Sequence, residues 1–260
     1  MHSIKALSAV SNHEKEIKKA FRGNVVYDGP PVFDGALYCL GFQNRSGSNL
    51  LGGYLRNTPY FSGFQEHLNF NSVIGQSKRW GADSFPDFIR ESTRRLGDGK
   101  DAHGYKASLG QLMMLERFGI PKMYKDGLKI IHITRNDIVG QAISLQIASQ
   151  TKRWTSAMPG VMDDADVKFD PQKISRLIDS ALESSNGVAF FAELFGYPRL
   201  HVSYEEVVAS PEQVLKRIAI FSGQDGADWS VTKPEIERQA SALNDTFRQK
   251  YLEATKKQVM

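Results

Sequence analysis

The sequence predicts a three-layer α/β fold, in which helices flank a central parallel β-sheet. Two observations carry this prediction. Short runs that are apolar at nearly every position, such as 36–42 and 128–134, are typical of strands buried on both faces of a parallel sheet. Amphipathic stretches with helical spacing alternate with these runs along the chain. Ligands of such folds bind at the carboxyl ends of the strands, so the functional residues are expected there.

The chain begins with a polar segment, in which residues 13–22 (HEKEIKKAFR) predict a short surface helix. The sequence contains no internal repeat and no low-complexity linker. We therefore expect residues 1–35 to form a helical N-terminal extension and residues 36–260 to form one domain. Besides the two long strands, 199–203 predicts a shorter strand and 104–107 a weaker one.

Helical patterns lie between and after these strands, and the clearest are 109–118, 137–151 and 171–185. The second of these follows its strand directly and has Asn136 available as a cap. Ser210, Pro211 and Gln213 are typical of a helix start, with an N-cap, a proline at the first position and a capping-box side chain. Gly223 is expected to end that helix.

The composition, with 41% hydrophobic and 24% charged residues, is that of an ordinary globular protein. No apolar run reaches the roughly 18 residues that a membrane span needs, and residues 1–19 lack the apolar centre of a secretory signal. The single cysteine, Cys39, lies in an apolar strand and is expected to be buried. These features favour a cytoplasmic protein. The net charge of +4 suits a polyanionic small ligand as well as a nucleic acid.

A small polar loop, residues 43–49 (QNRSGSN), joins the first strand to the apolar stretch 50–55. A strand, a polar loop and a helix in this order form an anion site, because backbone N–H groups and the positive end of the helix converge on the ligand. Ser48 and Asn49 add side-chain donors, and Arg45 adds a fixed charge. The alternative interpretation is a serine-rich turn that only caps a helix.

The loop lacks the lysine of the motif G-x-x-x-x-G-K-[ST], which binds the β- and γ-phosphates of a nucleoside triphosphate. This absence disfavours a Mg²⁺-dependent phosphotransferase of the P-loop type. A donor with one anionic group at its 5′ end and no metal requirement fits better. A nucleotide-binding protein without catalytic activity is the third hypothesis.

The stretch from Arg45 to Ser48 resembles the 5′-phosphosulfate loop of sulfotransferases, and most closely that of the bacterial trehalose 2-sulfotransferase-like family, which reads R-S-G-S-T. Asn49 replaces the family threonine, so weaker or rearranged sulfonate contacts are expected. Seven further segments resemble family motifs in the same order: Gln65-Glu66, Lys106 with Gln111, Arg135-Asn136-Asp137, Gln141 to Leu145, Lys152-Arg153-Trp154, Val202 to Glu206, and Arg238-Gln239 with Leu243-Asn244. Their joint order, over roughly residues 36–250, is what makes the resemblance specific.

The resemblance implies a P-loop-like fold, a sulfotransferase domain over 36–260 and a homodimer. The implied reaction moves a sulfuryl group from 3′-phosphoadenosine 5′-phosphosulfate (PAPS) to a hydroxyl of a sugar or glycolipid by in-line displacement. The residues implied to bind the 5′ end of the donor are Arg45, Ser46, Gly47, Ser48 and Asn49. Arg135 and Ser144 are implied to bind the 3′-phosphate, and Arg153 is a candidate for closing over the nucleotide.

The spacing of Arg135 and Ser144 supports this pairing independently. Arg135 ends the second long strand, and Ser144 lies about two turns into the helix that follows, so it can face the strand end. The alternatives are an ordinary ion pair of Arg135 with Asp137 and a small Ser144 packed against the sheet.

Glu66 is the candidate general base, and Arg45 is expected to stabilise the charge on the leaving oxygen. An ordinary glutamate pKa is about 4.3, so either burial raises the pKa of Glu66 or proton transfer is concerted with sulfuryl transfer. His67 is the alternative base, and an exposed loop position is the alternative for both residues. His132 and His201 lie within strands and are expected to be core residues. No H-x-x-x-H or C-x-x-C pair exists, so no metal is expected.

The sequence does not identify the acceptor. Its contacts are expected to come from variable loops at 68–98 and 156–170. Phe70, Trp80 and Phe85 are aromatic residues in the first of these segments that could stack on sugar rings, although core packing is the favoured role for each.

Overall fold

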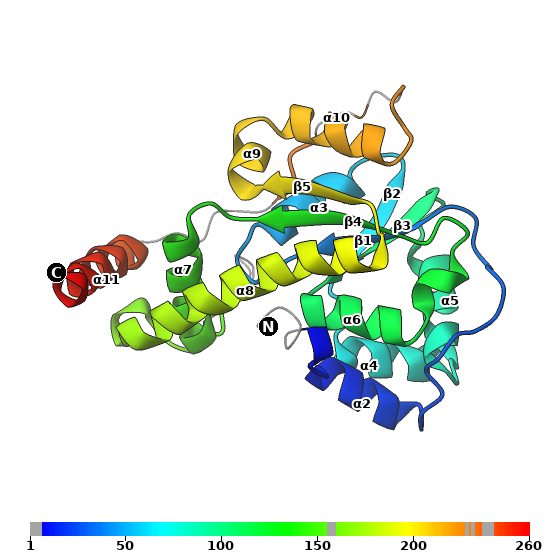
Figure 1. Ribbon diagram of the computed structural model, residues 1–260, viewed down its shortest axis with the longest axis horizontal. Coiled ribbons are helices and arrows are strands. Elements are labelled where there is room, and N and C mark those ends of the chain that lie inside the picture. Colours follow the sequence, from blue (N-terminus) through cyan, green and yellow to red (C-terminus); the bar gives the residue numbers. More distant parts are fainter. Residues whose placement is uncertain (1–6, 155–159, 227–228, 230–231, 236–241) are drawn as a thin grey trace.

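The computed structural model describes residues 7–154, 160–226, 229, 232–235 and 242–260. At its centre lies a five-stranded sheet with the strand order β2-β3-β1-β4-β5, in which all neighbouring strands are parallel (Figure 1). The strands are β1 (Leu37–Gly41), β2 (Phe61–Gln65), β3 (Ala102–Ala107), β4 (Leu128–Thr134) and β5 (Arg199–Ser203). The predicted parallel α/β architecture is confirmed.

The named helices are α2 (Asn12–Ala20), α3 (Ser48–Arg56), α4 (Phe70–Trp80), α5 (Phe85–Leu96), α6 (Leu109–Arg117), α7 (Ile138–Thr151), α8 (Pro171–Phe195), α9 (Tyr204–Ala209), α10 (Pro211–Phe221) and α11 (Ala242–Val259). In Figure 1, α9 and α10 lie on one side of the sheet, and α2, α4 and α6 lie on the other. Helices α7, α11 and the first part of α8 extend beyond the sheet and share a smaller apolar cluster. No described helix has the length and apolar character of a membrane span.

Alternation along the strands divides the core between the two faces of the sheet. Leu37 and Cys39 of β1 pack into the cluster with α6, whereas Tyr38 and Leu40 pack into the cluster with α3 and α10. Cys39 is fully buried, as predicted, and burial raises the pKa of its thiol well above the ordinary value. The thiol is therefore protonated and serves as a small apolar side chain.

The structure confirms the four predicted strands and corrects several other expectations. The segment 68–98, expected to be a variable loop, contains helices α4 and α5, and Phe85 is fully buried in the core. Helix α8 continues ten residues beyond the predicted end at 185, to Phe195. Asp137 rather than Asn136 caps α7, because its side chain accepts the Gly140 N–H. His201 is exposed, since β5 forms an edge of the sheet.

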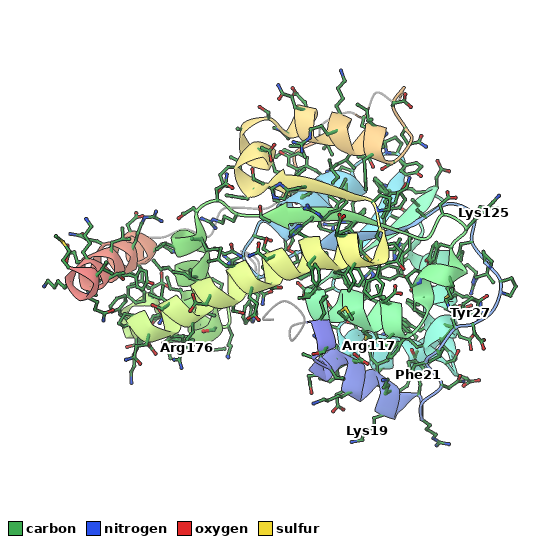
Figure 2. The ribbon with its side chains drawn as sticks, viewed as in Figure 1. Lys19, Phe21, Tyr27, Arg117, Lys125 and Arg176 are labelled. Atoms are coloured by element: carbon green, nitrogen blue, oxygen red, sulfur yellow. The ribbon has the colours of Figure 1, made fainter. Side chains whose placement is uncertain are left out.

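The N-terminal helix is more than a surface element. Ile17 of α2 and Phe21 pack into the same cluster as Leu37 of the sheet, so the apolar core is continuous across residue 35. Glu14 is fully buried, and its carboxylate binds Lys18 at 3.1 Å and Arg117 at 2.6 Å. Figure 2 labels Arg117, which projects from α6 beside α2.

Replacing Arg117 by Ala is expected to lower the free energy of unfolding by about 3 kcal/mol, because it removes the closest charge partner of a buried carboxylate. Urea unfolding at neutral pH measures this change. Arg94→Ala is the matched control, because it removes an ion pair on the surface with Glu91, and its midpoint should stay that of the native protein. Equal midpoints for the two variants would contradict the prediction.

Candidate active site

The loop between β1 and α3 has the geometry of an anion site. Helix α3 begins at Ser48, and its N-cap Gly47 has φ +88°, a conformation that favours glycine. Arg45 also has a positive φ, +65°, so the chain turns sharply twice before the helix. Ser46 and Ser48 are buried. The strand, loop and helix predicted from the sequence are therefore present, with the amino end of α3 at the carboxyl edge of the sheet.

Gly47 is required for a close approach as well as for its conformation. A Cβ atom at this position would lie 2.4 Å from Cδ2 of Tyr204, the first residue of α9. The tyrosine ring thus closes the side of the loop that a side chain would otherwise occupy.

Gly47→Ala is expected to lower the free energy of unfolding by about 2–3 kcal/mol, because it combines a strained φ with a clash against an aromatic ring. The matched control is Gly23→Ala, since Gly23 has a similar φ of +85° but nothing within 4 Å of the added Cβ. That control should cost only about 1–2 kcal/mol. Chemical unfolding of both variants measures the difference, and a Gly23 variant as unstable as the Gly47 variant would contradict it.

Arg45 joins the loop to helix α7. Its Nε donates a hydrogen bond to Oγ of Ser144 at 2.8 Å, and its Nη1 donates to the carbonyl oxygen of Trp154 at 3.1 Å. The sequence predicted Ser144 near Arg135, and the hydrogen bond that the structure shows for it is with Arg45 instead. Two residues that the sequence placed in different parts of the site lie in direct contact.

Arg135 ends β4 and lies near Arg45. Its guanidinium carbon is 5.1 Å from the centre of the Tyr204 ring, and its Nη2 is 3.4 Å from a carboxylate oxygen of Asp137. Burial lowers the pKa of Arg45, and the nearby positive charge of Arg135 lowers it further. The positive charge of Arg135 thus disfavours that of Arg45 at the carboxyl edge of the sheet, an arrangement that suits an anionic ligand.

Beside the two arginines, Oγ of Ser46 and Nε of Arg135 are buried and have no hydrogen-bond partner within the described part of the chain, and Nδ1 of His67 after β2 is a further such atom. Buried polar groups in proteins are usually paired, because leaving one unpaired costs free energy. Unpaired groups beside two arginines therefore point to a ligand with several acceptor oxygens.

The segment that carries Arg135 is held by residues whose roles the sequence did not show. The Glu205 carboxylate accepts the backbone N–H groups of Asn136 and Asp137 at 3.0 and 3.2 Å. Arg248 of α11 donates to Asp137 Oδ1 at 2.6 Å. Asp137 thus has a cationic partner besides Arg135. An ion pair with Asp137 therefore explains only part of the surroundings of Arg135.

Glu66 and Lys106 form the other end of the site. Glu66 directly follows β2, and Lys106 of β3 is 97% buried. The Lys106 ammonium donates to Oε1 of Glu66 at 2.9 Å and to Oδ1 of Asn49 at 2.6 Å. Lys106 therefore links the candidate base to the anion loop. The sequence placed Lys106 only within a family-like motif and gave it no role.

The charges and hydrogen bonds around Glu66 contradict the expectation that its pKa is raised. Burial acts to raise the pKa of Glu66, but the charge and hydrogen bond of Lys106, together with a hydrogen bond from Asn69, outweigh it. The pKa of Glu66 is therefore lowered from 4.5 rather than raised. The expectation that burial raises this pKa is therefore wrong, and concerted proton transfer stays a prediction.

The remaining site candidates, His67 and Arg153, make other contacts. His67 bonds to Gln65 Oε1 at 3.1 Å, and burial followed by the charge of Arg56 lowers its pKa. Arg153 is partly exposed and lies 3.6 Å from Asp164. Of the two segments expected to contact the acceptor, 156–170 is described only from residue 160, and Arg238-Gln239 of the last motif lies outside the described residues.

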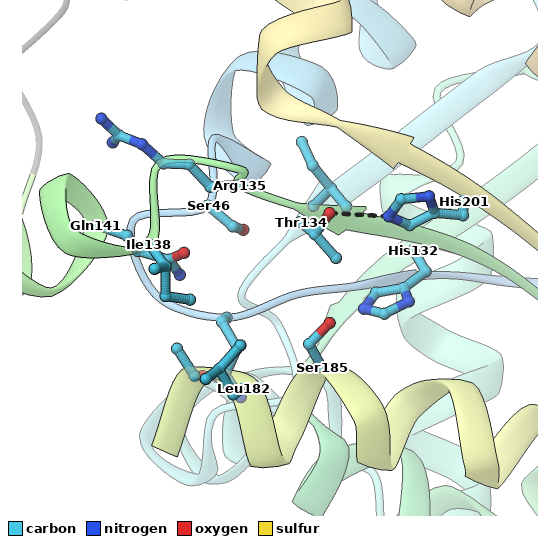
Figure 3. Close-up of a pocket in the computed structure, with 12 residues that line it drawn as sticks. Ser46, His132, Thr134, Arg135, Ile138, Gln141, Leu182, Ser185 and His201 are labelled. Carbon is cyan, nitrogen blue, oxygen red and sulfur yellow. Dashed lines mark hydrogen bonds between the residues drawn. The ribbon is translucent and has the colours of Figure 1, made fainter. Parts of the chain in front are cut away.

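A cavity of about 230 Å³ opens beside the loop, between the ends of β4 and β5 and helix α8 (Figure 3). Its lining includes Ser46, Arg135, Gln141, His132, Ser185 and His201. The structure confirms His132 as a buried residue. Within the described ranges, no three His, Cys, Asp or Glu side chains converge as metal ligands would.

Comparison with known proteins identifies a family. The family model of the Stf0 sulphotransferases matches residues 116–254, more than half of the chain. The trehalose 2-sulfotransferase of Mycobacterium tuberculosis (strain Erdman) is 25% identical over 246 residues, which cover 80% of this chain and 91% of that protein. The trehalose 2-sulfotransferase of Mycolicibacterium smegmatis is 30% identical over 123 residues, 47% of this chain and 45% of that protein.

Two solved structures resemble the chain at lower identity. A sulfotransferase from Alicyclobacillus acidocaldarius has a TM-score of 0.44 and 17% identity, and the match covers 87% of this chain and 93% of that one. The sulfotransferase domain from the curacin biosynthetic pathway has a TM-score of 0.47 and 13% identity, covering 84% and 97%.

Proposed function

The chain belongs to the Stf0 sulphotransferase family and is a sulfotransferase, and from this premise we propose that it transfers the sulfuryl group of PAPS to a hydroxyl of a sugar or glycolipid. The observation that supports PAPS as the sulfuryl donor is the pair of arginines, Arg45 and Arg135. They lie close together, beside buried hydrogen-bond donors that have no partner within the described residues. The curated relatives act on trehalose, by their names, and this supports a sugar as the acceptor class.

In this proposal the two anionic ends of the donor bind to different parts of the site. The loop residues Arg45, Ser46, Gly47, Ser48 and Asn49 bind the 5′-phosphosulfate. Arg135 and Ser144 bind the 3′-phosphate, and Arg153 closes over the nucleotide. The contact between Arg45 and Ser144 supports this assignment, because the loop and α7 are close enough for one nucleotide to reach both.

The reaction is an in-line displacement at sulfur. A bond forms between the acceptor oxygen and sulfur while the bond from sulfur to the bridging phosphate oxygen breaks, and the hydroxyl proton passes to Glu66. Arg45 and the loop N–H groups stabilise the negative charge that develops on the leaving phosphate. Lys106, within hydrogen-bond distance of both Asn49 and Glu66, supplies a positive charge between loop and base.

The family match disfavours a Mg²⁺-dependent phosphotransferase, as the missing lysine of the loop already does. A binding protein without catalysis would need Arg45 and Arg135 but not Glu66. A homodimer is proposed with the function on the family resemblance, and a cytoplasmic location on the composition of the chain and its single cysteine.

Calorimetric titration tests the donor. The purified protein is titrated with adenosine 3′,5′-bisphosphate, the product nucleotide, in EDTA, and with ADP in the presence and absence of Mg²⁺. We expect metal-free binding that depends on the 3′-phosphate. A preference for Mg²⁺–ADP would contradict the proposal and favour a kinase, whereas no binding of either nucleotide would reduce the Arg45 loop to a helix cap.

A further inference from the structure

The short turn between β2 and α4 carries Glu66, and its side-chain contacts are unusual. Asn69 donates from Nδ2 to Oε2 of Glu66 at 2.9 Å and accepts at Oδ1 from Nε2 of Gln111 at 3.1 Å. Asn69 is also the N-cap residue of α4, where an asparagine normally accepts a backbone N–H of the first turn. Here its side chain makes no capping bond, because both of its polar ends are used by Glu66 and Gln111.

The first N–H group of α4 has a partner from a distant part of the chain. The backbone N–H of Phe70 donates to Nδ1 of His13 at 3.0 Å, and the His13 ring lies 5.7 Å from the Phe70 ring. Nδ1 can accept this bond only when it carries no proton. Burial lowers the pKa of His13, with an opposing effect of Glu66, so the ring is neutral at physiological pH.

Helix α2, which carries His13, is fixed to α6 by other contacts. Glu14 of α2 binds Arg117 of α6 at 2.6 Å, and Ile17 is fully buried in the core that α6 also lines. Helix α6 begins two residues after Ala107, the end of the strand that carries Lys106. Through His13, the N-terminal helix therefore connects the segment of Lys106 to the turn of Glu66.

We propose that His13 is a positioning residue for catalysis, which caps α4 from outside that helix and so holds the Glu66 turn against Lys106. It lies outside the region matched by the family model, and its helix gains a role that the family match does not assign. The inference rests on the proposed function of Glu66 as the base. A displacement of a base by about 1 Å can reduce turnover about 100-fold, so a single cap can matter.

Two substitutions of His13 distinguish the effect of losing the hydrogen-bond acceptor Nδ1 from the effect of changing the size of the side chain. His13→Leu keeps an apolar side chain against Phe70 but leaves its N–H without the Nδ1 acceptor. His13→Asn places Oδ1 near the position of Nδ1 and should restore the bond. Ile17→Ala is the control for general loosening of α2, because it removes core packing of the same helix and leaves the His13 acceptor in place.

The first measurement is amide hydrogen exchange of the peptide that covers residues 66–72, in each folded variant without substrates. We expect exchange at least tenfold faster in His13→Leu and within about threefold of native in His13→Asn and Ile17→Ala. Unchanged exchange in His13→Leu would overturn the proposal, whatever reaction the protein catalyses.

The second measurement is turnover of PAPS with trehalose as the probe acceptor, beside calorimetric binding of adenosine 3′,5′-bisphosphate. In His13→Leu, kcat should fall about 10–100-fold while nucleotide affinity stays within about twofold. Loss of kcat in Ile17→Ala equal to that in His13→Leu, or failure of Asn to restore it, would also overturn the proposal. No turnover by the native protein, together with the expected exchange results, would instead contradict the proposed acceptor and leave the His13 cap standing.

Discussion

Replacing Glu66 by Gln is expected to reduce kcat for sulfuryl transfer by about 10²–10⁴-fold, the usual contribution of a general base. Glutamine has nearly the size of glutamate, and its amide oxygen can still accept from Lys106. What the substitution removes is the group that takes the hydroxyl proton. Steady-state turnover of PAPS, with trehalose or whichever sugar acceptor is found active, measures the change.

Two controls show whether this loss reports the base. The affinity for adenosine 3′,5′-bisphosphate should remain within about threefold of native, because Glu66 lies at the β2 end of the site, away from Arg135. His67→Gln changes the alternative base and should retain most of the activity, since His67 bonds to Gln65 and not to Lys106. Full activity of Glu66→Gln would remove Glu66 from the mechanism, and an inactive His67→Gln would put His67 in its place.

The pH dependence follows from the same contacts. The base is active as the carboxylate, and Lys106 holds the pKa of Glu66 below 4.5. As the pH falls through this lowered pKa the carboxylate becomes protonated, so the acidic limb of kcat/KM is expected below pH 4.5 for the native protein. Lys106→Met removes the cation while burial continues to raise the pKa, so the limb should move to higher pH. A limb that stays in place would contradict the role assigned to Lys106.

The sequence predicted most of the sheet because buried parallel strands are apolar at nearly every position. Strand β2 was the exception. Its five residues, FSGFQ, include Gly63 and Phe64, both with positive φ, where the pairing with β3 shifts its register. A short strand with such an irregularity has neither the length nor the alternation that reveals a strand. Glu66 was nevertheless predicted as a site residue, with support from the resemblance of Gln65-Glu66 to a family motif.

The site was predictable where its groups follow strand ends. Arg135 directly follows one apolar strand, and Arg45 lies in the loop four residues after another. The helical rise after Arg135 was sufficient to bring Ser144 back to that edge. The supporting residues were not predictable. Glu205, Arg248 and His13 each act on a segment far away in the chain, and no local pattern distinguishes them from exposed polar residues. Likewise, the lowered pKa of Glu66 depends on the distance to Lys106, which only the structure provides.

Arg135→Ala is expected to weaken binding of adenosine 3′,5′-bisphosphate about 100-fold. The arginine is the group proposed to neutralise the 3′-phosphate, and charge-assisted hydrogen bonds of this kind contribute about 1.5–3 kcal/mol each. The affinity for adenosine 5′-monophosphate, which lacks the 3′-phosphate, should change by less than about threefold. Calorimetry with both nucleotides therefore measures the loss of selectivity for the 3′-phosphate.

The competing interpretation is that Arg135 only forms an ion pair with Asp137. Arg248→Ala discriminates between the two, because Arg248 also binds Asp137, at 2.6 Å, and comes from α11 rather than from a strand end. If Arg135 binds the nucleotide, Arg135→Ala loses affinity and Arg248→Ala keeps it within about threefold. If Asp137 is the relevant partner, the two variants should lose stability alike and both should keep the native selectivity for the 3′-phosphate. The Arg135 guanidinium lies over the ring of Tyr204, and its buried Nε has no partner within the described residues. Because neither feature involves Asp137, we expect the first outcome.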